Sequence, residues 1–143
     1  MSSLRIATAH WSGRGTDGQG QLETGSAALR HTPYSYTTRF AGGVGTNPEE
    51  LIAAAHAGCL SMKLAFNLQV AGFTATRIDT RCEVAMHEGL ITESVLTVAA
   101  VVPGLGAAQF QELVADARQN CPVSKLLNTV IRCDATLLPA EVA

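Results

Sequence analysis

The chain has 143 residues, of which 47% are hydrophobic and 15% charged. That length suffices for one globular core and not for two, so we predict a single domain over residues 1–143. The formal net charge of −2 gives no broad basic surface, which argues against nucleic acid as a partner. No run of about 18 consecutive apolar residues occurs, and the first residues do not resemble an export signal, so we expect a cytoplasmic protein without a membrane partner.

The first part of the chain is predicted to form β-strands. Strand-like sequence at 4–11 and at 22–29 flanks a turn-rich stretch at 13–20, which predicts a hairpin with a flexible tip. Aromatic and β-branched residues predict a third strand over 34–40, stopped by a glycine-rich loop at 41–45. That loop lacks the Gly-Lys-Ser/Thr ending of a phosphate-binding loop, so we interpret it as a connection only.

A strong set of start signals predicts a long helix in the middle of the chain. Asn47 is a good N-cap, Pro48 suits the first helical position, and Glu50 is placed to reach back to the cap. We expect the helix to run to residue 70 or 71 and to stop at Gly72. Its apolar face is predicted from residues spaced three and four apart: Leu51, Ile52, Ala55, Cys59, Met62 and Phe66.

The remaining sequence predicts two strands, two helices and a last strand. Residues 78–86 alternate between apolar and polar side chains and are expected to pair with 91–102 as an antiparallel hairpin across 87–89. An amphipathic helix is predicted over 107–119, followed by a short helix over 122–127 that begins at a proline. The last strand is expected over 129–137.

Four cysteines carry the chemical interest of this chain: Cys59, Cys82, Cys121 and Cys133. In a reducing compartment we do not expect disulfide staples, and the scattered thiols lack the spacing of a metal site. Cys82 and Cys133 fall on apolar strand faces, where a cysteine is usually a small buried hydrophobe. Cys121 precedes a proline at a helix cap, where backbone N–H groups favour a thiolate, whereas Cys59 lies too deep in its helix for that effect and needs a cation from elsewhere.

The residues alone leave the chemistry of Cys59 open. His56 lies one helical turn before it, so one candidate is a Cys/His hydrolase with Cys59 as nucleophile and His56 as base. An arginine would instead hold the thiolate as a permanent counter-charge and donate hydrogen bonds to a peroxide oxygen. A third candidate is a non-catalytic domain, whose thiols sense redox state or line a ligand site.

Two cysteine motifs and their surroundings resemble the OsmC/Ohr family of bacterial thiol peroxidases, and specifically its OsmC, or osmotically inducible, branch. The more extensive motif surrounds the predicted start of the long helix and continues to Cys59, and the second is Cys-Pro-Val-Ser at 121–124. The matching segments span most of the chain: 9–11, 33–34, 38–40, 45–62, 71–74, 102–104 and 121–124.

The resemblance implies an α+β fold with two antiparallel sheets around a long central helix, assembled as an intertwined homodimer. It also implies reduction of organic hydroperoxides and hydrogen peroxide, in defence against oxidative or osmotic stress. The family's cycle uses no metal, haem or flavin, and a dithiol reductant of the lipoyl or thioredoxin type completes it.

The resemblance also implies roles for individual residues. Cys59 matches the cysteine that attacks the peroxide and becomes a sulfenic acid, and Cys121 matches the one that resolves it to a disulfide. Arg39 matches the arginine placed against the reactive thiol, and Glu49 would hold its guanidinium by a bidentate pair. In the Ohr branch the arginine comes from the early glycine-rich hairpin, so Arg14 is a rival to Arg39.

Overall fold

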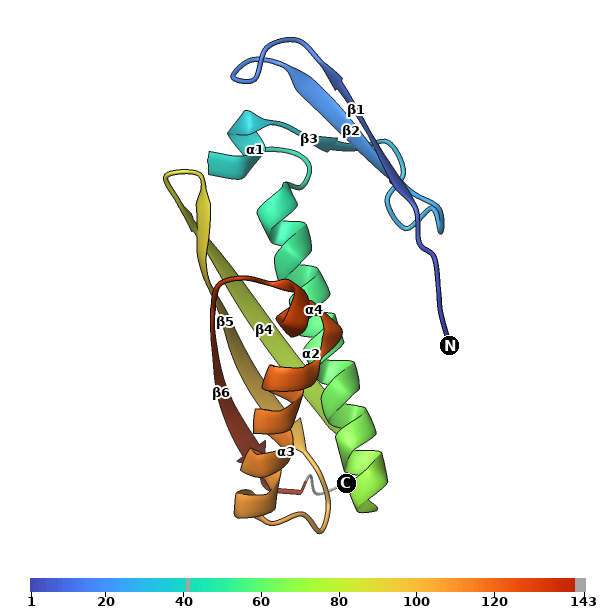
Figure 1. Cartoon of the computed structure of the whole chain (residues 1–143), viewed down its shortest axis with the longest axis vertical. Helices are drawn as coiled ribbons and strands as arrows, with labels where there is room; N and C mark the ends of the chain where they lie inside the picture. Colours follow the sequence, from blue (N-terminus) through green and yellow to red (C-terminus); the bar gives the residue numbers. More distant parts are fainter. Residues whose placement is uncertain (41, 141–143) are drawn as a thin grey trace. The chain divides into compact units, whose positions relative to one another are not determined.

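The computed structural model describes residues 1–40 and 42–140, and the chain divides into two compact units, Met1–Leu51 and Ile52–Ala143 (Figure 1). The first unit contains β1 (Ala7–Ser12), β2 (Gln19–Thr24), β3 (Thr32–Tyr34) and α1 (Tyr36–Phe40). The helix α2 (Pro48–Ala71) begins there and continues into the second unit. The second unit also contains β4 (Arg77–His87), β5 (Leu90–Val101), α3 (Ala107–Asn120), α4 (Pro122–Leu126) and β6 (Val130–Leu138).

The first unit is built on a three-stranded antiparallel sheet in the order β1-β2-β3. The predicted hairpin is present, but its second strand runs over 19–24 instead of 22–29. Thr24 accounts for the early end, because its side-chain oxygen accepts a hydrogen bond from the backbone N–H of Leu29 at 3.1 Å. Ala27 adopts a φ of 63°, which a strand does not allow, so these residues form a turn.

The strand predicted over 34–40 is wrong, because residues 36–40 form the helix α1. Ser35 and Thr38 account for the difference. The N–H of Ser35 donates to Thr38 Oγ1 at 2.8 Å, and the N–H of Thr38 donates to Ser35 Oγ at 3.2 Å. This reciprocal capping stabilises a helix start and outweighs the β-branched composition. Residue 41, the first of the predicted loop at 41–45, lies outside the described residues.

The ends of α2 follow the sequence signals. Asn47 caps the start, accepting the N–H of Glu50 at 2.8 Å, but the Glu50 carboxylate binds the Thr46 hydroxyl at 2.8 Å instead of reaching back to the cap. At the other end Gly72 has a φ of 89°, and the N–H groups of Gly72 and Phe73 bind the carbonyls of Gln69 at 3.1 Å and Leu68 at 2.8 Å. This pair of bonds is the Schellman motif.

The buried face of α2 differs from the predicted one. The buried residues recur every four positions, at His56, Leu60, Leu64 and Leu68, whereas Met62 and Phe66 are 64% and 57% exposed. Apolar residues occur all around this helix, so their spacing does not select one face. Because it is 24 residues long and apolar on all sides, α2 also meets the length and composition criteria for a membrane-spanning helix. Core helices of water-soluble proteins meet the same criteria.

The second unit packs helices on one face of a mixed sheet in the order β4-β5-β6. The predicted antiparallel hairpin of β4 and β5 is confirmed, with Glu88 and Gly89 at positive φ in its turn. The prediction of a purely antiparallel sheet is wrong here, because β6 pairs with β5 in parallel. The helices α3 and α4 lie between these two strands in sequence and return the chain to the end from which β5 starts, as a parallel pair requires.

The hydrophobic core of the second unit forms between α2, α3 and the β4-β5-β6 sheet (Figure 1). Leu96, Val98 and Ala100 point to one face of β5, since side chains alternate along a strand. Residues of α2 and α3 pack against them in a single cluster, and its fully buried members on these helices are Leu60, Leu64, Leu68, Phe110 and Ala117. The predicted inner faces of β4 and β6 are confirmed, because Ile78, Cys82, Ile131, Cys133, Ala135 and Leu137 pack on this cluster.

Replacing Gly72 with alanine is expected to lower the free energy of unfolding by about 1 kcal/mol, because a Cβ is disfavoured at a left-handed φ. Nothing lies within 4 Å of the position that a Cβ would occupy, so the cost comes from the backbone alone. Gly15→Ala is the matched control, since that position is also open and lies outside the left-handed region. Urea unfolding of the three proteins measures the effect, and equal midpoints for Gly72→Ala and Gly15→Ala would contradict it.

Candidate functional site

The two cysteines of the resembled motifs are neighbours in the second unit. Cys59 lies in α2 and is partly buried, and Cys121 lies directly before α4 and is fully buried. The Cys121 side chain acts on Cys59 both by its charge and through a side-chain hydrogen bond. All four cysteines are free thiols. The fold therefore brings together two reduced sulfur atoms from segments far apart in sequence.

Cys121 caps the short helix α4, as its position before Pro122 predicts. Its backbone is extended, with φ −66° and ψ 142°, and its sulfur accepts the N–H of Ser124 at 3.4 Å. The Ser124 hydroxyl lies 3.0 Å from the same sulfur. Two polar groups of Ser124 thus converge on a buried thiol, and both can donate to it when it is a thiolate.

Cys59 lies in surroundings that oppose its ionisation within this unit. Burial raises the pKa of the Cys59 thiol above its ordinary value, and Cys121 raises it further. The opposing influence is a hydrogen bond from the backbone of Val123 at the start of α4, which lowers the pKa. A neutral N–H is a weaker stabiliser of a thiolate than a cation, so an anionic Cys59 needs an additional positive group.

The other two cysteines are structural, as predicted. Cys82 on β4 and Cys133 on β6 both pack against the core cluster. Burial raises the pKa of the Cys82 thiol and raises that of Cys133 to about 11. At neutral pH both sulfurs stay protonated and are poor nucleophiles.

His56 lies next to the thiol pair in α2, but its ring contacts two serines. Its Nδ1 lies 2.6 Å from Ser94 Oγ on β5, and its Nε2 lies 2.8 Å from Ser124 Oγ on α4. The sequence did not predict either serine as part of the site. The Cys-Pro-Val-Ser motif contained a signal for Ser124, because a hydroxyl three residues after an N-cap lies on the cap's side of the helix; nothing local indicated Ser94.

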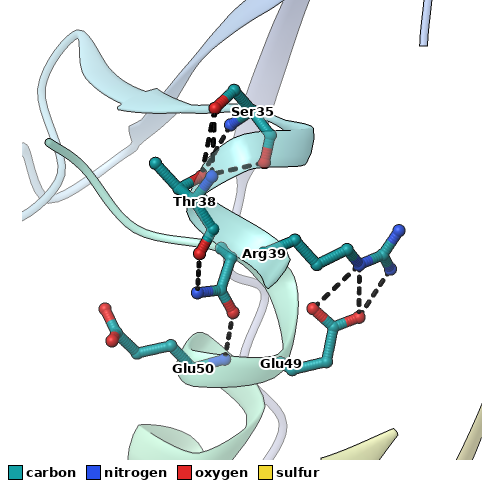
Figure 2. A network of polar contacts seen from close by, with 6 residues as sticks. Ser35, Thr38, Arg39, Glu49 and Glu50 are labelled. Carbon is teal, nitrogen blue, oxygen red and sulfur yellow. Dashed lines mark hydrogen bonds and ion pairs between the residues drawn. The ribbon is translucent and has the colours of Figure 1, made fainter. Parts of the chain in front are cut away.

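Arg39 and Glu49 form the expected ion pair in the first unit (Figure 2). The Nε of Arg39 donates to both carboxylate oxygens of Glu49, at 2.9 and 3.0 Å, and its Nη2 donates to one of them. This bond lowers the pKa of Glu49 and raises that of Arg39. Because the folded pKa of Glu49 is lowered, the pair stabilises the fold at neutral pH, and that stabilisation is lost as the pH falls through the folded pKa.

The start of α2 positions this ion pair. Asn47 uses both ends of its side-chain amide, accepting from the N–H of Glu50 and donating to the carbonyl of Thr38 at 2.8 Å, so it ties α1 to the first turn of α2 (Figure 2). Arg39 follows Thr38 on α1, and Glu49 precedes Glu50 on α2. The same amide therefore caps a helix and sets the guanidinium beside its carboxylate.

Arg14, the alternative arginine, lies in the hairpin turn and binds Asp17. Its Nη2 lies 2.9 Å from the Asp17 carboxylate, and 80% of its side chain is exposed, compared with 38% for Arg39. The two candidate pairs, Cys59 with Cys121 and Arg39 with Glu49, belong to different units. Within residues 1–40 and 42–140, no three His, Cys, Asp or Glu side chains form a group that could hold a metal ion.

Proteins similar to this chain include relatives named peroxiredoxin OsmC and a solved organic hydroperoxide resistance protein. A protein named peroxiredoxin OsmC from Escherichia coli strain K12 is 44% identical over 141 residues, which cover 96% of this chain and 99% of the relative. A protein of the same name from Shigella flexneri matches equally. Among solved structures, the organic hydroperoxide resistance protein OsmC of Legionella pneumophila aligns with a TM-score of 0.67 at 24% identity, over 98% of each chain.

This structural likeness shows that the fold is shared, an α+β fold of the OsmC/Ohr type. The sequence comparison is more specific, because the identity to the curated relatives extends over nearly the whole chain. In addition, residues 41–136, which contain both Cys59 and Cys121, match the family model described as OsmC-like protein. The chain therefore belongs to the OsmC-like protein family.

Proposed function

We propose that this chain is a cysteine-based peroxidase that reduces organic hydroperoxides and hydrogen peroxide, with Cys59 as the attacking thiol and Cys121 as the resolving thiol. The observation that carries the proposal is the proximity of two reduced thiols on α2 and before α4. Membership in a family whose relatives are named peroxiredoxins supports it. Defence against oxidative or osmotic stress in the cytoplasm is the role that we propose for the reaction.

The proposed cycle has three steps. The Cys59 thiolate attacks one peroxide oxygen, the O–O bond breaks, and the products are a sulfenic acid on Cys59 and an alcohol or water. Cys121 then attacks the Cys59 sulfur, forming a disulfide and releasing water. An external dithiol of the lipoyl or thioredoxin type reduces this disulfide by thiol exchange, so the cycle itself needs no metal or organic cofactor.

We propose that Arg39 supplies the positive charge that Cys59 lacks within its own unit. A guanidinium keeps its charge at all relevant pH values, and Glu49 fixes its orientation through Nε and Nη2. A guanidinium carries five N–H donors, so donors remain for the thiolate and for a peroxide oxygen. By this proposal Arg39 and Glu49 act together with Cys59 and Cys121 in one site.

A second copy of the chain is the proposed partner that completes this site. Several apolar side chains of α2 are exposed in the single chain, where they have no partner to bury them: Met62 at 64%, Phe66 at 57% and Val70 at 90%. Large exposed apolar side chains gathered on one helix are typical of an interface. We therefore propose that the two units form one domain over 1–143, which functions as an intertwined homodimer.

The hydrolase alternative is less well supported by the geometry. A Cys/His hydrolase needs an imidazole nitrogen facing the nucleophile, and both ring nitrogens of His56 are engaged by serine hydroxyls. The redox-sensor alternative predicts oxidation of the thiols without repeated turnover. Measurement of turnover with a dithiol reductant separates that case from a peroxidase.

Cys59→Ser is expected to abolish hydroperoxide consumption with dithiothreitol or a lipoyl dithiol, because the attacking sulfur is gone. Cys121→Ser is expected to stall after one turnover, since the sulfenic acid then has no resolving partner. Cys133→Ala is the control, as that thiol is buried on β6 and protonated at neutral pH. Full consumption by Cys59→Ser, or ester hydrolysis that survives in Cys121→Ser, would count against the proposal.

Arg39→Ala is expected to lower kcat/KM for a hydroperoxide by about 10²-fold, the usual effect of removing a charged stabiliser. Glu49→Gln should give a smaller loss, because it keeps the arginine but frees its side chain. Arg14→Ala is the matched control and should retain activity, since Arg14 binds Asp17 in the hairpin turn. Steady-state kinetics measure kcat/KM for each variant. A loss of kcat/KM in Arg14→Ala with none in Arg39→Ala would assign the role of the positive group beside Cys59 to Arg14.

Phe66→Asp is expected to weaken the homodimer and to lower peroxidase activity with it, because a carboxylate would be buried at the interface. Gln119→Asp, which adds the same charge on the exposed face of α3, is expected to leave the dimer intact. Light scattering coupled to gel filtration reports the mass of each variant. A parent protein that elutes as a monomer and is fully active would disprove the dimer.

A further inference from the structure

A continuous series of polar contacts crosses the apolar interior of the second unit. It starts at Cys82 on β4, whose sulfur lies 3.2 Å from Ser94 Oγ, and Ser94 Oγ lies 2.6 Å from His56 Nδ1. On the other side of the ring, His56 Nε2 lies 2.8 Å from Ser124 Oγ, which lies 3.0 Å from the Cys121 sulfur. We call these five residues the histidine relay.

Four of the five members of the histidine relay are buried. His56, Ser94 and Cys121 are 0% exposed, and Ser124 is 7% exposed. In this setting a well-packed apolar side chain serves stability at least as well as a hydrogen-bonded polar one. Stability alone therefore does not account for an imidazole at the one position of the buried α2 stripe that is not leucine.

The contacts of His56 define two ways in which protons can be arranged. Burial lowers the pKa of His56, so the ring is neutral at neutral pH and has one N–H and one lone pair. With the proton on Nδ1, the ring donates to Ser94, and its Nε2 accepts the Ser124 O–H. Ser124 Oγ then accepts the S–H of Cys121, which gives an unbroken path from the thiol to a basic nitrogen.

With the proton on Nε2, the path has the opposite polarity. The ring then donates to Ser124, and the Ser124 O–H points at the Cys121 sulfur, which also accepts the backbone N–H of Ser124. This arrangement stabilises a Cys121 thiolate with two hydrogen bonds. Ser94, His56 and Ser124 can therefore remove the proton from Cys121 together and then stabilise the resulting thiolate.

We propose that His56, acting through the hydroxyl of Ser124, accepts the proton of the Cys121 thiol when that sulfur resolves the sulfenic acid of Cys59. The inference rests on the proposed function, which assigns the two thiols their roles. His56 and Ser124 act on the reaction through Cys121, so they are positioning residues and not the attacking groups.

The proposed step balances without an added reactant. The S–S bond forms between Cys121 and Cys59, the S–O bond of the sulfenic acid breaks, and its oxygen leaves as hydroxide. The Cys121 proton moves to Ser124 Oγ while the Ser124 proton moves to His56 Nε2, and the Nδ1–H of the resulting imidazolium donates a hydrogen bond to Ser94 Oγ. The imidazolium then returns its extra proton through the Ser124 hydroxyl, and that proton joins the departing hydroxide, so the sum is a thiol and a sulfenic acid giving a disulfide and water.

The groups around the histidine relay confine proton exchange to its Cys121 end. Cys82, at the far end, has a raised pKa from burial and from the charge of Glu83, so it keeps its own proton. Cys59 is the titratable group that faces Cys121 from α2. Among the charged residues of the neighbouring helices, Asp116 on α3 and Lys125 on α4 are solvent-accessible. Hydrogen bonds from Asn120 and Asn67 lower the pKa of Asp116, and the charges of Lys63 and Lys125 lower it further.

The test is a single turnover of the reduced protein with one equivalent of hydroperoxide, followed by rapid acid quench and thiol alkylation. Peroxide loss reports the attack by Cys59, and the Cys59–Cys121 disulfide found by mass spectrometry reports resolution. Ser124→Ala and His56→Gln are expected to slow resolution by about 10²-fold at neutral pH, the usual size of general-base assistance. The rate of peroxide loss in both variants should equal that of the parent protein.

The pH profile separates proton transfer from a merely structural role. Without the base, hydroxide from solvent must remove the Cys121 proton, so the rate of each variant should rise toward the parent rate as the pH increases from about 6 to about 9. Ser124→Thr keeps a hydroxyl and should restore most of the parent rate. Cys133→Ala, which removes a core thiol on β6 outside the histidine relay, is the control and should resolve as the parent does.

Two results would overturn the inference while leaving the proposed function intact. One is resolution at the parent rate by both Ser124→Ala and His56→Gln. The other is a loss in the rate of resolution that has the same size at every pH and is not restored by Ser124→Thr. That result would mean only that the substitutions displace Cys121. A parent protein that consumes peroxide without forming the Cys59–Cys121 disulfide would instead overturn the proposed function, and the inference with it.

Discussion

The capping of α4 by the Cys121 sulfur is the interaction on which the candidate site depends. The sulfur accepts the N–H of Ser124, and this bond fixes both the sulfur and the first turn of the helix. The same turn presents the backbone of Val123 to Cys59 and the hydroxyl of Ser124 to His56. The five-residue helix α4 thus contacts both thiols and links them to the buried His56. The geometry of the candidate site therefore depends on this short helix.

The two units contribute different kinds of chemistry to the proposed reaction. The second unit contributes the two thiols, and burial together with the neighbouring Cys121 opposes ionisation of Cys59. The first unit provides a permanent cation, Arg39, held by Glu49 beside the start of α2. A thiol that stays protonated until a cation approaches is protected from unwanted oxidation, because the thiolate is the reactive form.

Local signals in the sequence predicted the elements that depend on local interactions. The ends of α2 follow from Asn47, Pro48 and Gly72, and the cap of α4 follows from Pro122. The strand expected over 34–40 was wrong, because two side-chain hydrogen bonds between Ser35 and Thr38 outweighed composition. The buried face of α2, the parallel pairing of β6 and the contacts of His56 depend on segments distant in sequence, so no local pattern could indicate them. The pairing of Arg39 with Glu49 was expected from the family resemblance and not from spacing.

The positions of Cys59 and Cys121 in the chain have a thermodynamic consequence. Between them lie the second half of α2 and all of β4, β5 and α3, so a covalent link would enclose the greater part of the second unit in one loop. Closing so large a loop restricts the unfolded chain and stabilises the folded one by about 4 kcal/mol in the chain-entropy description. The oxidised protein would then be the more heat-resistant form. Any reductant that regenerates the thiols must have a low enough potential to overcome that added stability.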